Sequence, residues 1–295
     1  MRLLKASRMM RSLRNSFVFL GVIGAASTQA QTNGNDKSLY DAHLLDVQKR
    51  APAGFTILIE RPFVVIGNET SSRVRERAEN TVRWAVNRLK KDFFSRDPVE
   101  IIDVWLFKDK ASYDRYTKEL FHDTPTTPYG YYSAQHQALI MNIETGGGTL
   151  VHEIVHPYMR ANFPDCPAWF NEGMGSLFEQ SEDRNGHICG LTNWRLPALQ
   201  EAIQKNKIPS FEKLLSTTTD EFYGGGSNYS HNYAQARYLC YYLQEKGLLP
   251  KFYREFRSTA GQDKTGLKAL RKVLGTDDLK QFQKGWKLFV LRLNQ

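Results

Sequence analysis

Two histidines four residues apart, His152 and His156, enclose Glu153 in the stretch from Thr149 to His156. On a helix that advances about 100° per residue, the two histidines fall roughly 40° apart on one face, and Glu153 lies about 60° from His156. Imidazole nitrogens on one face are suitable ligands for Zn²⁺, and a nearby carboxylate can accept a proton from a water molecule that the metal activates. The spacing predicts a helix with a catalytic zinc site and Glu153 as its general base.

A third metal ligand is predicted on the following helix. Residues 166–173 read Cys-Pro-Ala-Trp-Phe-Asn-Glu-Gly, which places Glu172 sixteen residues after His156. This distance suits the end of one helix, a turn and the start of another. Catalytic zinc sites use three protein ligands and keep a fourth position open, so Glu172 completes the set. The alternative for the first motif is an amphipathic helix on which His152, Glu153 and His156 only face solvent.

The two motifs together resemble the gluzincins, the metallopeptidase superfamily of thermolysin and the zinc aminopeptidases. Within that superfamily the chain is most similar to the small bacterial peptidase MA-like proteins, because residues 233–243 share their C-terminal pattern of tyrosine, alanine and leucine. The likeness covers about residues 125–290. It implies a zinc-dependent peptidase that hydrolyses peptide bonds, with His152, His156 and Glu172 as the metal ligands.

The resemblance also implies a residue in the C-terminal part that stabilises the oxyanion of the tetrahedral intermediate. Tyr233 is the first candidate and His231 the second, although both could instead be core or cleft-wall residues. In many relatives, a carboxylate four residues after the third ligand orients a histidine ligand. Ser176 occupies that position in this chain, so the resemblance supplies no orienting carboxylate.

A strand pair is predicted at 129–134 and 138–143, before three glycines and the zinc helix. In the gluzincins, a strand just before the zinc helix lies at the rim of the cleft, where its free backbone edge can pair with an extended substrate. An ordinary edge strand is the alternative. The Gly-x-Met-Glu-Asn motif of the zinc aminopeptidases is absent from 138–144, which disfavours a dedicated aminopeptidase.

The wider pattern predicts an α+β fold. A small sheet-and-helix portion occupies 55–145, with strands at 55–60, 63–67 and 101–107 and a helix at about 70–94. A mostly helical, zincin-like portion at 146–295 carries the zinc helix, which should continue beyond Pro157 although that residue cannot donate to the carbonyl of Glu153. A second zinc helix is expected at 168–178, followed by a polar stretch at 181–196 that contains Gly186 and Gly190, and then by further helices.

The first 30 residues have the pattern of a signal peptide. Five basic residues precede an apolar run at 17–26 and a small-residue cleavage site at Ala30. A run of ten residues is too short to span a bilayer, although a retained anchor is the alternative. Residues 31–54 are expected to form a linker. The mature chain should be exported, periplasmic or secreted, without stable membrane association.

The charge balance does not favour a nucleic-acid partner. The whole chain carries a formal charge of +9, but after residue 30 there are 35 basic and 31 acidic residues, a net charge of +4. The basic residues are scattered along amphipathic stretches rather than interleaved with aromatic residues. The predicted partner is a peptide or protein substrate.

Cysteine content permits one disulfide in an exported protein. Cys166 and Cys189 form the expected pair, since both lie in polar surroundings near the zinc segment, and the absence of any disulfide is the alternative. Cys240 lies in an aromatic helical run and is expected to be a buried thiol.

Two other functions share this sequence pattern. A zinc amidase that acts on cell-wall peptide would use the same metal site. A zincin-fold binding protein with little or no catalytic activity is the other alternative, and Ser176 together with the loosely matching C-terminal part is consistent with it.

The signal-peptide pattern predicts a mature N-terminus at or near Gln31. N-terminal sequencing of the protein recovered from the culture medium or periplasm should find it. Recovery of the intact N-terminus at Met1 on an exported or cytosolic product would contradict the prediction.

Overall fold

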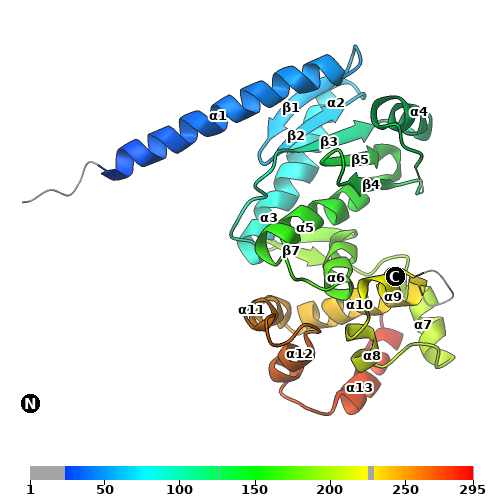
Figure 1. Cartoon of the computed structure of the whole chain (residues 1–295). Helices are drawn as coiled ribbons and strands as arrows, with labels where there is room; N and C mark the ends of the chain where they lie inside the picture. The colour runs from blue at the N-terminus through cyan, green and yellow to red at the C-terminus, as the bar shows by residue number, and fades with distance from the viewer. Residues whose placement is uncertain (1–23, 126, 225–228, 295) are drawn as a thin grey trace, which may run out of the picture. The chain divides into compact units, whose positions relative to one another are not determined.

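The computed structural model describes residues 24–125, 127–224 and 229–294 (Figure 1). Most of the predicted signal peptide, residues 1–23, lies outside the described residues. Helix α1 spans Gly24–Arg50, so the expected linker is helical as far as Arg50. The linker prediction missed this helix, although no proline interrupts the segment. No helix in the described part of the chain is long and apolar enough to cross a membrane.

Residues 46–295 form one compact unit that contains a five-stranded mixed sheet. The strand order is β1-β2-β3-β5-β4. The outer pairs β1/β2 and β4/β5 are antiparallel, whereas β2/β3 and β3/β5 are parallel. The strands are β1 (Thr56–Glu60), β2 (Phe63–Gly67), β3 (Ile102–Phe107), β4 (Gly130–Ser133) and β5 (Ala138–Asn142).

The three central strands, β2, β3 and β5, are buried along their whole length. Their residues are almost entirely apolar, as expected for strands of a sheet that helices cover. The predicted helix at 70–94 is confirmed, and Thr70 caps it through a bond from the backbone N–H of Arg73. It consists of α2 (Ser71–Arg77), a π-helical segment η1 (Ala78–Arg83) and α3 (Trp84–Asp92). Helix α4 (Lys110–Phe121) follows β3.

The second half of the unit is mostly helical, which confirms the predicted α+β class. Helix α5 (Gly148–Asn162) continues through Pro157 as expected, and α6 (Ala168–Phe178) has the predicted bounds. The remaining helices are α7 (Leu196–Gln204), α8 (Phe211–Leu215), α9 (Thr219–Tyr223), α10 (Tyr229–Glu245), α11 (Leu249–Thr259), α12 (Leu267–Leu274) and α13 (Leu279–Leu291). A short 3-10 segment, η2 (Ile143–Thr145), joins β5 to α5.

The free sheet edge lies on a different strand from the one just before the zinc helix. Strand β5 is paired on both sides, with β3 and with β4, and cannot accept a further strand. Strand β4 pairs only with β5 and is therefore the edge strand on this side. The hairpin reverses the chain before α5, so the second strand of the pair lies inside the sheet.

The polar stretch at 181–196, for which no strand was predicted, contains a β-hairpin. Strands β6 (Ser181–Arg184) and β7 (His187–Gly190) pair antiparallel around a two-residue turn. The turn residues Asn185 and Gly186 both have positive φ, at 57° and 79°. An Asn-Gly pair between short strands is the typical signal for this turn, and the prediction missed it because the strands are polar.

The prediction of a disulfide between Cys166 and Cys189 is wrong: all three cysteines are free. Cys166 lies just before α6, and Cys189 lies on β7 beyond the other end of that helix. An 11-residue helix is about 16 Å long, whereas the Cα atoms of a disulfide lie within about 7 Å. Cys240 is buried as predicted.

Helices α6 and α10 pack closely because α6 has a glycine, Gly173, at their contact. A Cβ atom on Gly173 would lie 3.0 Å from the sulfur of Cys240 and 3.2 Å from the carbonyl oxygen of Ala236, both on α10. Those distances leave no room for a side chain without movement of α10. Gly173 therefore fixes the distance between the helix that carries Glu172 and the helix behind it.

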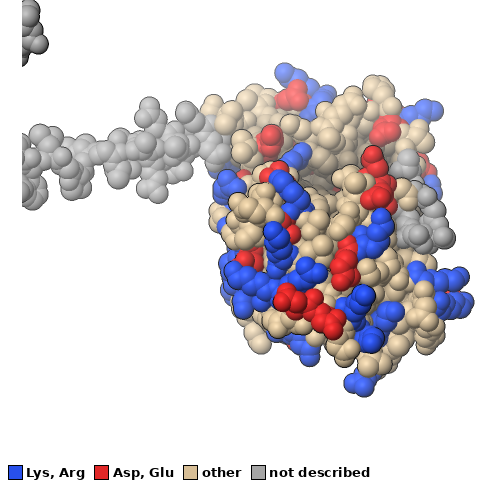
Figure 2. All heavy atoms as spheres, turned by 60° about the horizontal axis from the view of Figure 1, so that its bottom comes forward, with Lys and Arg blue, Asp and Glu red and all other residues tan. Residues whose placement is uncertain are grey.

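The basic residues of the unit are concentrated in its C-terminal helices. Residues 246–295 contain twelve lysines and arginines but four acidic residues. Figure 2 shows Lys and Arg side chains gathered over this face, with fewer acidic side chains among them. Two of the four carboxylates, those of Asp263 and Asp278, accept bonds from backbone N–H groups at helix starts. The net charge of +4 after residue 30 thus conceals an uneven distribution.

Gly173→Ala should destabilise the protein by about 1 to 3 kcal/mol, since the added methyl group overpacks the contact between α6 and α10. The free energy of unfolding measured in a denaturant titration checks this. Gly285→Ala in α13 is the matched control, because its Cβ would meet open space. Alanine has the higher helix propensity, so Gly285→Ala should stabilise the protein or leave it unchanged. Equal effects of the two substitutions would contradict the packing argument.

Candidate metal site

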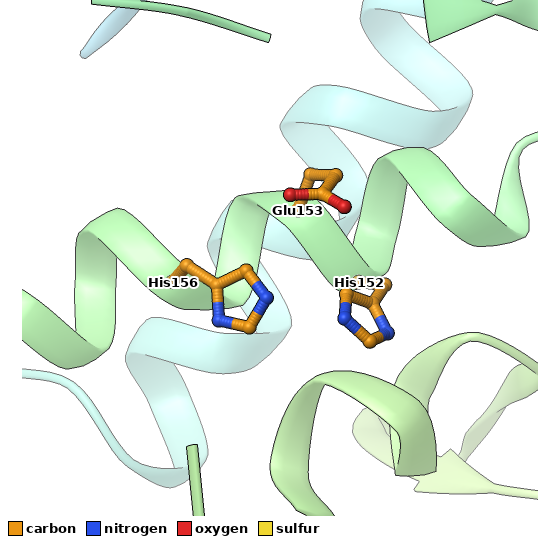
Figure 3. Close-up of side chains that lie close together, drawn as sticks. All are labelled: His152, Glu153 and His156. Carbon is orange, nitrogen blue, oxygen red and sulfur yellow. The ribbon is translucent and has the colours of Figure 1, made fainter. Parts of the chain in front are cut away.

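Helix α5 carries the two histidines and the glutamate of the first motif. Figure 3 shows the two imidazole rings close together on one side of α5, with the Glu153 carboxylate above them. The ring centroids of His152 and His156 lie 4.9 Å apart. His152, Glu153 and His156 each offer one possible ligand atom, and these atoms lie within 4.8 Å of one another. The helical spacing therefore brings the three groups together as predicted.

Glu172 on α6 approaches both imidazoles. Its Oε2 lies 3.2 Å from Nε2 of His152, and its Oε1 lies 3.8 Å from Nε2 of His156. In a tetrahedral zinc site with bonds of about 2.0 to 2.2 Å, ligand atoms are about 3.3 to 3.5 Å apart. The two imidazoles and the Glu172 carboxylate suit zinc in their chemistry, and the two distances lie just below and just above this spacing. Glu153 offers a ligand atom within 4.8 Å of those of both histidines, so it belongs to the same cluster.

Asn171, the residue before Glu172, orients the second histidine. Nδ1 of His156 lies 3.0 Å from Oδ1 of Asn171, which can only accept a hydrogen bond. Nδ1 therefore carries a proton in this hydrogen bond, and Nε2 is the ring nitrogen that faces Glu172. A hydrogen bond of this kind fixes the tautomer of a metal-binding histidine. This role of Asn171 was not predicted, although the residue lies inside the second motif, residues 166–173.

Glycine makes room for the first histidine. A Cβ atom on Gly175 would lie 3.1 Å from two ring atoms of His152, including Nε2. Ser176 is fully buried, and its hydroxyl has no hydrogen-bond partner among the described residues. It does not orient His152 through a hydrogen bond. The orientation of His152 therefore depends on Glu172 and on packing against Gly175.

Tyr223 on α9 supports the Glu172 carboxylate. Its hydroxyl donates a hydrogen bond of 2.6 Å to Oε1 of Glu172, the oxygen that faces His156. A capping box between Thr218 and Glu221 closes the N-terminus of helix α9 (Thr219–Tyr223). Tyr223 was not predicted as a site residue, because α9 was not predicted and Tyr223 lies fifty-one positions from Glu172.

The site is electrostatically coupled because its charged groups are buried together. Burial opposes the charged form of Glu172, but His152, His156 and Tyr223 outweigh it and lower the pKa of Glu172 to about 2. Burial also opposes charge on His152, but the neighbouring carboxylates raise its pKa to about 9. Without a metal ion, a proton on His152 balances the charge of Glu172. Burial raises the pKa of Glu153, and the two histidines partly offset this effect.

Tyr233 lies next to Tyr223, the residue that contacts Glu172. Its ring centroid is 6.3 Å from that of Tyr223 and 5.1 Å from that of Phe222, and the guanidinium of Arg195 lies 5.6 Å from it. It belongs to the aromatic cluster that supports Tyr223. The role of Tyr233 in stabilising an oxyanion stays a prediction.

His231, the second candidate, contributes to the electrostatic surroundings of Glu201 on α7. Its Nδ1 is buried and has no hydrogen-bond partner among the described residues. No contact between His231 and the metal-site residues occurs in the described part of the chain, so its predicted role also remains a prediction.

A fully buried arginine holds the C-terminal end of α6. Nε of Arg237 on α10 donates to the carbonyl oxygen of Ser176 at 2.8 Å, and its Nη2 donates to that of Leu191. Burial lowers the pKa of Arg237 to about 10. Carbonyl groups at a helix C-terminus have no partners within the helix and carry a partial negative charge, so a cation there stabilises the helix end. Arg237 thereby connects α6, which carries Glu172, to α10.

Comparison with known proteins adds no assignment, because no protein-family model and no curated protein matches the chain.

Tyr223→Phe should weaken zinc binding by about 10- to 100-fold, since removal of a hydrogen bond to a metal ligand typically has an effect of that size. Competition with a chromogenic chelator measures the zinc affinity directly. Tyr233→Phe in the same aromatic cluster is the matched comparison, and it should retain zinc. Equal zinc affinity in the Tyr223→Phe and wild-type proteins would show that the hydroxyl does not position Glu172.

Proposed function

We propose that this chain is a zinc-dependent metallopeptidase of the gluzincin type. The observation that carries the proposal is the approach of one buried carboxylate, Glu172, to Nε2 of both His152 and His156. Glu153 lies within reach of the same point, on the helix that carries the histidines. Two neutral imidazoles, one carboxylate and an open position form the ligand set of a catalytic zinc site.

His152, His156 and Glu172 would hold the zinc ion. Bound zinc supplies a Lewis acid that polarises the scissile carbonyl and lowers the pKa of water. Glu153 would accept the proton of the attacking water and pass it to the leaving amine. Burial, which raises the pKa of Glu153, improves the match of this carboxylate to both steps.

The β4 edge offers a place for an extended peptide. The backbone of Gly130–Ser133 pairs with β5 on one side only, so a peptide could add a strand on the other side. A hydrogen bond of 2.8 Å from Arg160 on α5 to the hydroxyl of Tyr132 joins this strand to the zinc helix. A substrate bound along β4 would thus be held by an element that contacts α5.

Stabilisation of the oxyanion by a residue of the C-terminal part belongs to the same proposal. Tyr233 remains the first candidate and His231 the second. Tyr223 is committed to Glu172, and its hydroxyl would serve the oxyanion only if that hydrogen bond broke.

Glu153→Gln should retain one zinc ion per chain but reduce peptide hydrolysis by about 10² to 10⁴, since it preserves the shape of the site and removes the general base. Glu172→Ala should lose both zinc and activity, because it removes a ligand. Metal analysis of the purified proteins and cleavage of a peptide library, with and without a chelator, measure the two effects.

Glu182→Gln on the exposed hairpin strand β6 is the matched control and should behave as the wild type. Hydrolysis by Glu153→Gln at the wild-type rate would contradict the mechanism and favour the binding-protein alternative. Cleavage of cell-wall amides but of no other peptide would favour the amidase.

A further inference from the structure

A cavity of about 540 Å³ lies at the N-terminal end of α5, outside the metal site itself. Its lining includes the glycine run 146–148 and the start of α5, together with Trp84 on α3, Tyr129 before β4, Gln180 after α6 and Trp194 before α7. None of the metal-site residues lines it. The cavity is therefore a second concave feature that the proposed chemistry does not explain.

The cavity adjoins the metal site. Thr149 and Val151 line it and precede His152 by three residues and one residue. At 1.5 Å of rise per residue, these positions lie within about 5 Å of His152 along the helix axis. Glu179 at the cavity wall is close enough to influence the pKa of both His152 and Glu153. A molecule cleaved at the metal site could extend into the cavity.

The cavity lining is polar but carries no free charge. Its one charged residue among the described residues, Glu179, forms an ion pair of 3.2 Å with Arg195. Asn80, Thr149 and Gln180 provide amide and hydroxyl groups that form no hydrogen bonds with other described residues. A charged ligand would therefore meet no opposite charge. A purely apolar side chain would leave these polar groups without partners, which is unfavourable.

Three aromatic residues complete the lining. Trp194 and Tyr129 are exposed, with 58% and 49% of their surface accessible, and Trp84 is half-buried. The guanidinium of Arg195 lies 3.9 Å from the ring centroid of Trp194 and fixes this indole at the cavity rim. Exposed rings beside amides and hydroxyls suit a ligand that combines flat C–H faces with many hydroxyl groups. An uncharged sugar has this combination.

We propose that the cavity binds a saccharide unit attached to the peptide that is cleaved at the metal site. The inference rests on the proposed function and names its substrate class, a glycan-bearing peptide. The sugar would stack on the exposed aromatic rings and exchange hydrogen bonds with the amides. Such a sugar could come from an O-glycosylated protein or from the amino-sugar-linked peptide of a cell wall, and the chemistry of recognition is shared.

The test compares peptides of identical sequence that differ only in the sugar. One carries an O-linked N-acetylhexosamine, one carries an N-terminal N-acetylmuramoyl group and one is unmodified. The wild type should cleave one of the sugar-bearing peptides with kcat/KM about tenfold or more above the unmodified peptide, and the preferred peptide identifies the source. Trp194→Ala should remove this preference and leave cleavage of the unmodified peptide unchanged. Leu288→Ala, at an exposed apolar residue of α13, is the matched control and should keep the preference.

A binding measurement separates this inference from the peptidase proposal. Saturation-transfer NMR of N-acetylglucosamine with the Glu153→Gln protein detects sugar binding without turnover, and the signal should be lost in the Glu153→Gln, Trp194→Ala double variant. Sugar binding without cleavage of any peptide would support the cavity assignment and contradict the peptidase. Cleavage of all three peptides at equal kcat/KM, or the absence of saturation transfer, would overturn the saccharide inference and leave the peptidase standing.

Discussion

The close packing of α5 against α6 is the constraint on which the site depends. It brings the Glu172 carboxylate between two imidazoles from another helix, with one oxygen directed to each ring. Gly175 allows this approach, because a Cβ atom there would meet the ring of His152. At the other end of the contact, a Cβ atom on Gly148 would lie only 2.1 Å from the carbonyl oxygen of Glu179. Gly148 at the start of α5 and Gly175 on α6 therefore belong to the geometry of the metal site.

A second group of residues holds α6 from behind. Gly173 permits close contact with α10, Arg237 binds the last carbonyl groups of α6, and Tyr223 holds the carboxylate of Glu172. Desolvation of an arginine is costly, so its place at a helix end, where partial negative charges are concentrated, is physically reasonable. Such support keeps ligands in place before a metal ion binds, which is the general requirement for an efficient site.

Helix α5 also connects the three regions where a substrate would be handled. Its middle carries the metal-site residues, its N-terminal end borders the cavity, and it contacts edge strand β4 through Arg160. A peptide along the sheet edge and a group in the cavity would both lie next to the same helix. This arrangement relates the proposed chemistry to the proposed substrate class without any further element.

The sequence by itself determined the parts that depend on local periodicity. A helical repeat of 3.6 residues places His152 and His156 on one face, and the same reasoning predicted α6, the α+β class and the continuation of α5 beyond Pro157. Two local features were missed, because α1 was taken as a linker and no hairpin was predicted around Asn185-Gly186.

Tertiary structure alone decided which distant residues meet. It selected Tyr223 as the partner of Glu172, made β4 the free sheet edge and kept Cys166 apart from Cys189. It also assembled the cavity from segments between residues 80 and 194. The physical reason is that side-chain chemistry and local spacing fix the direction in which a residue points from its own helix or strand. The packing of several elements into one core decides what that residue faces.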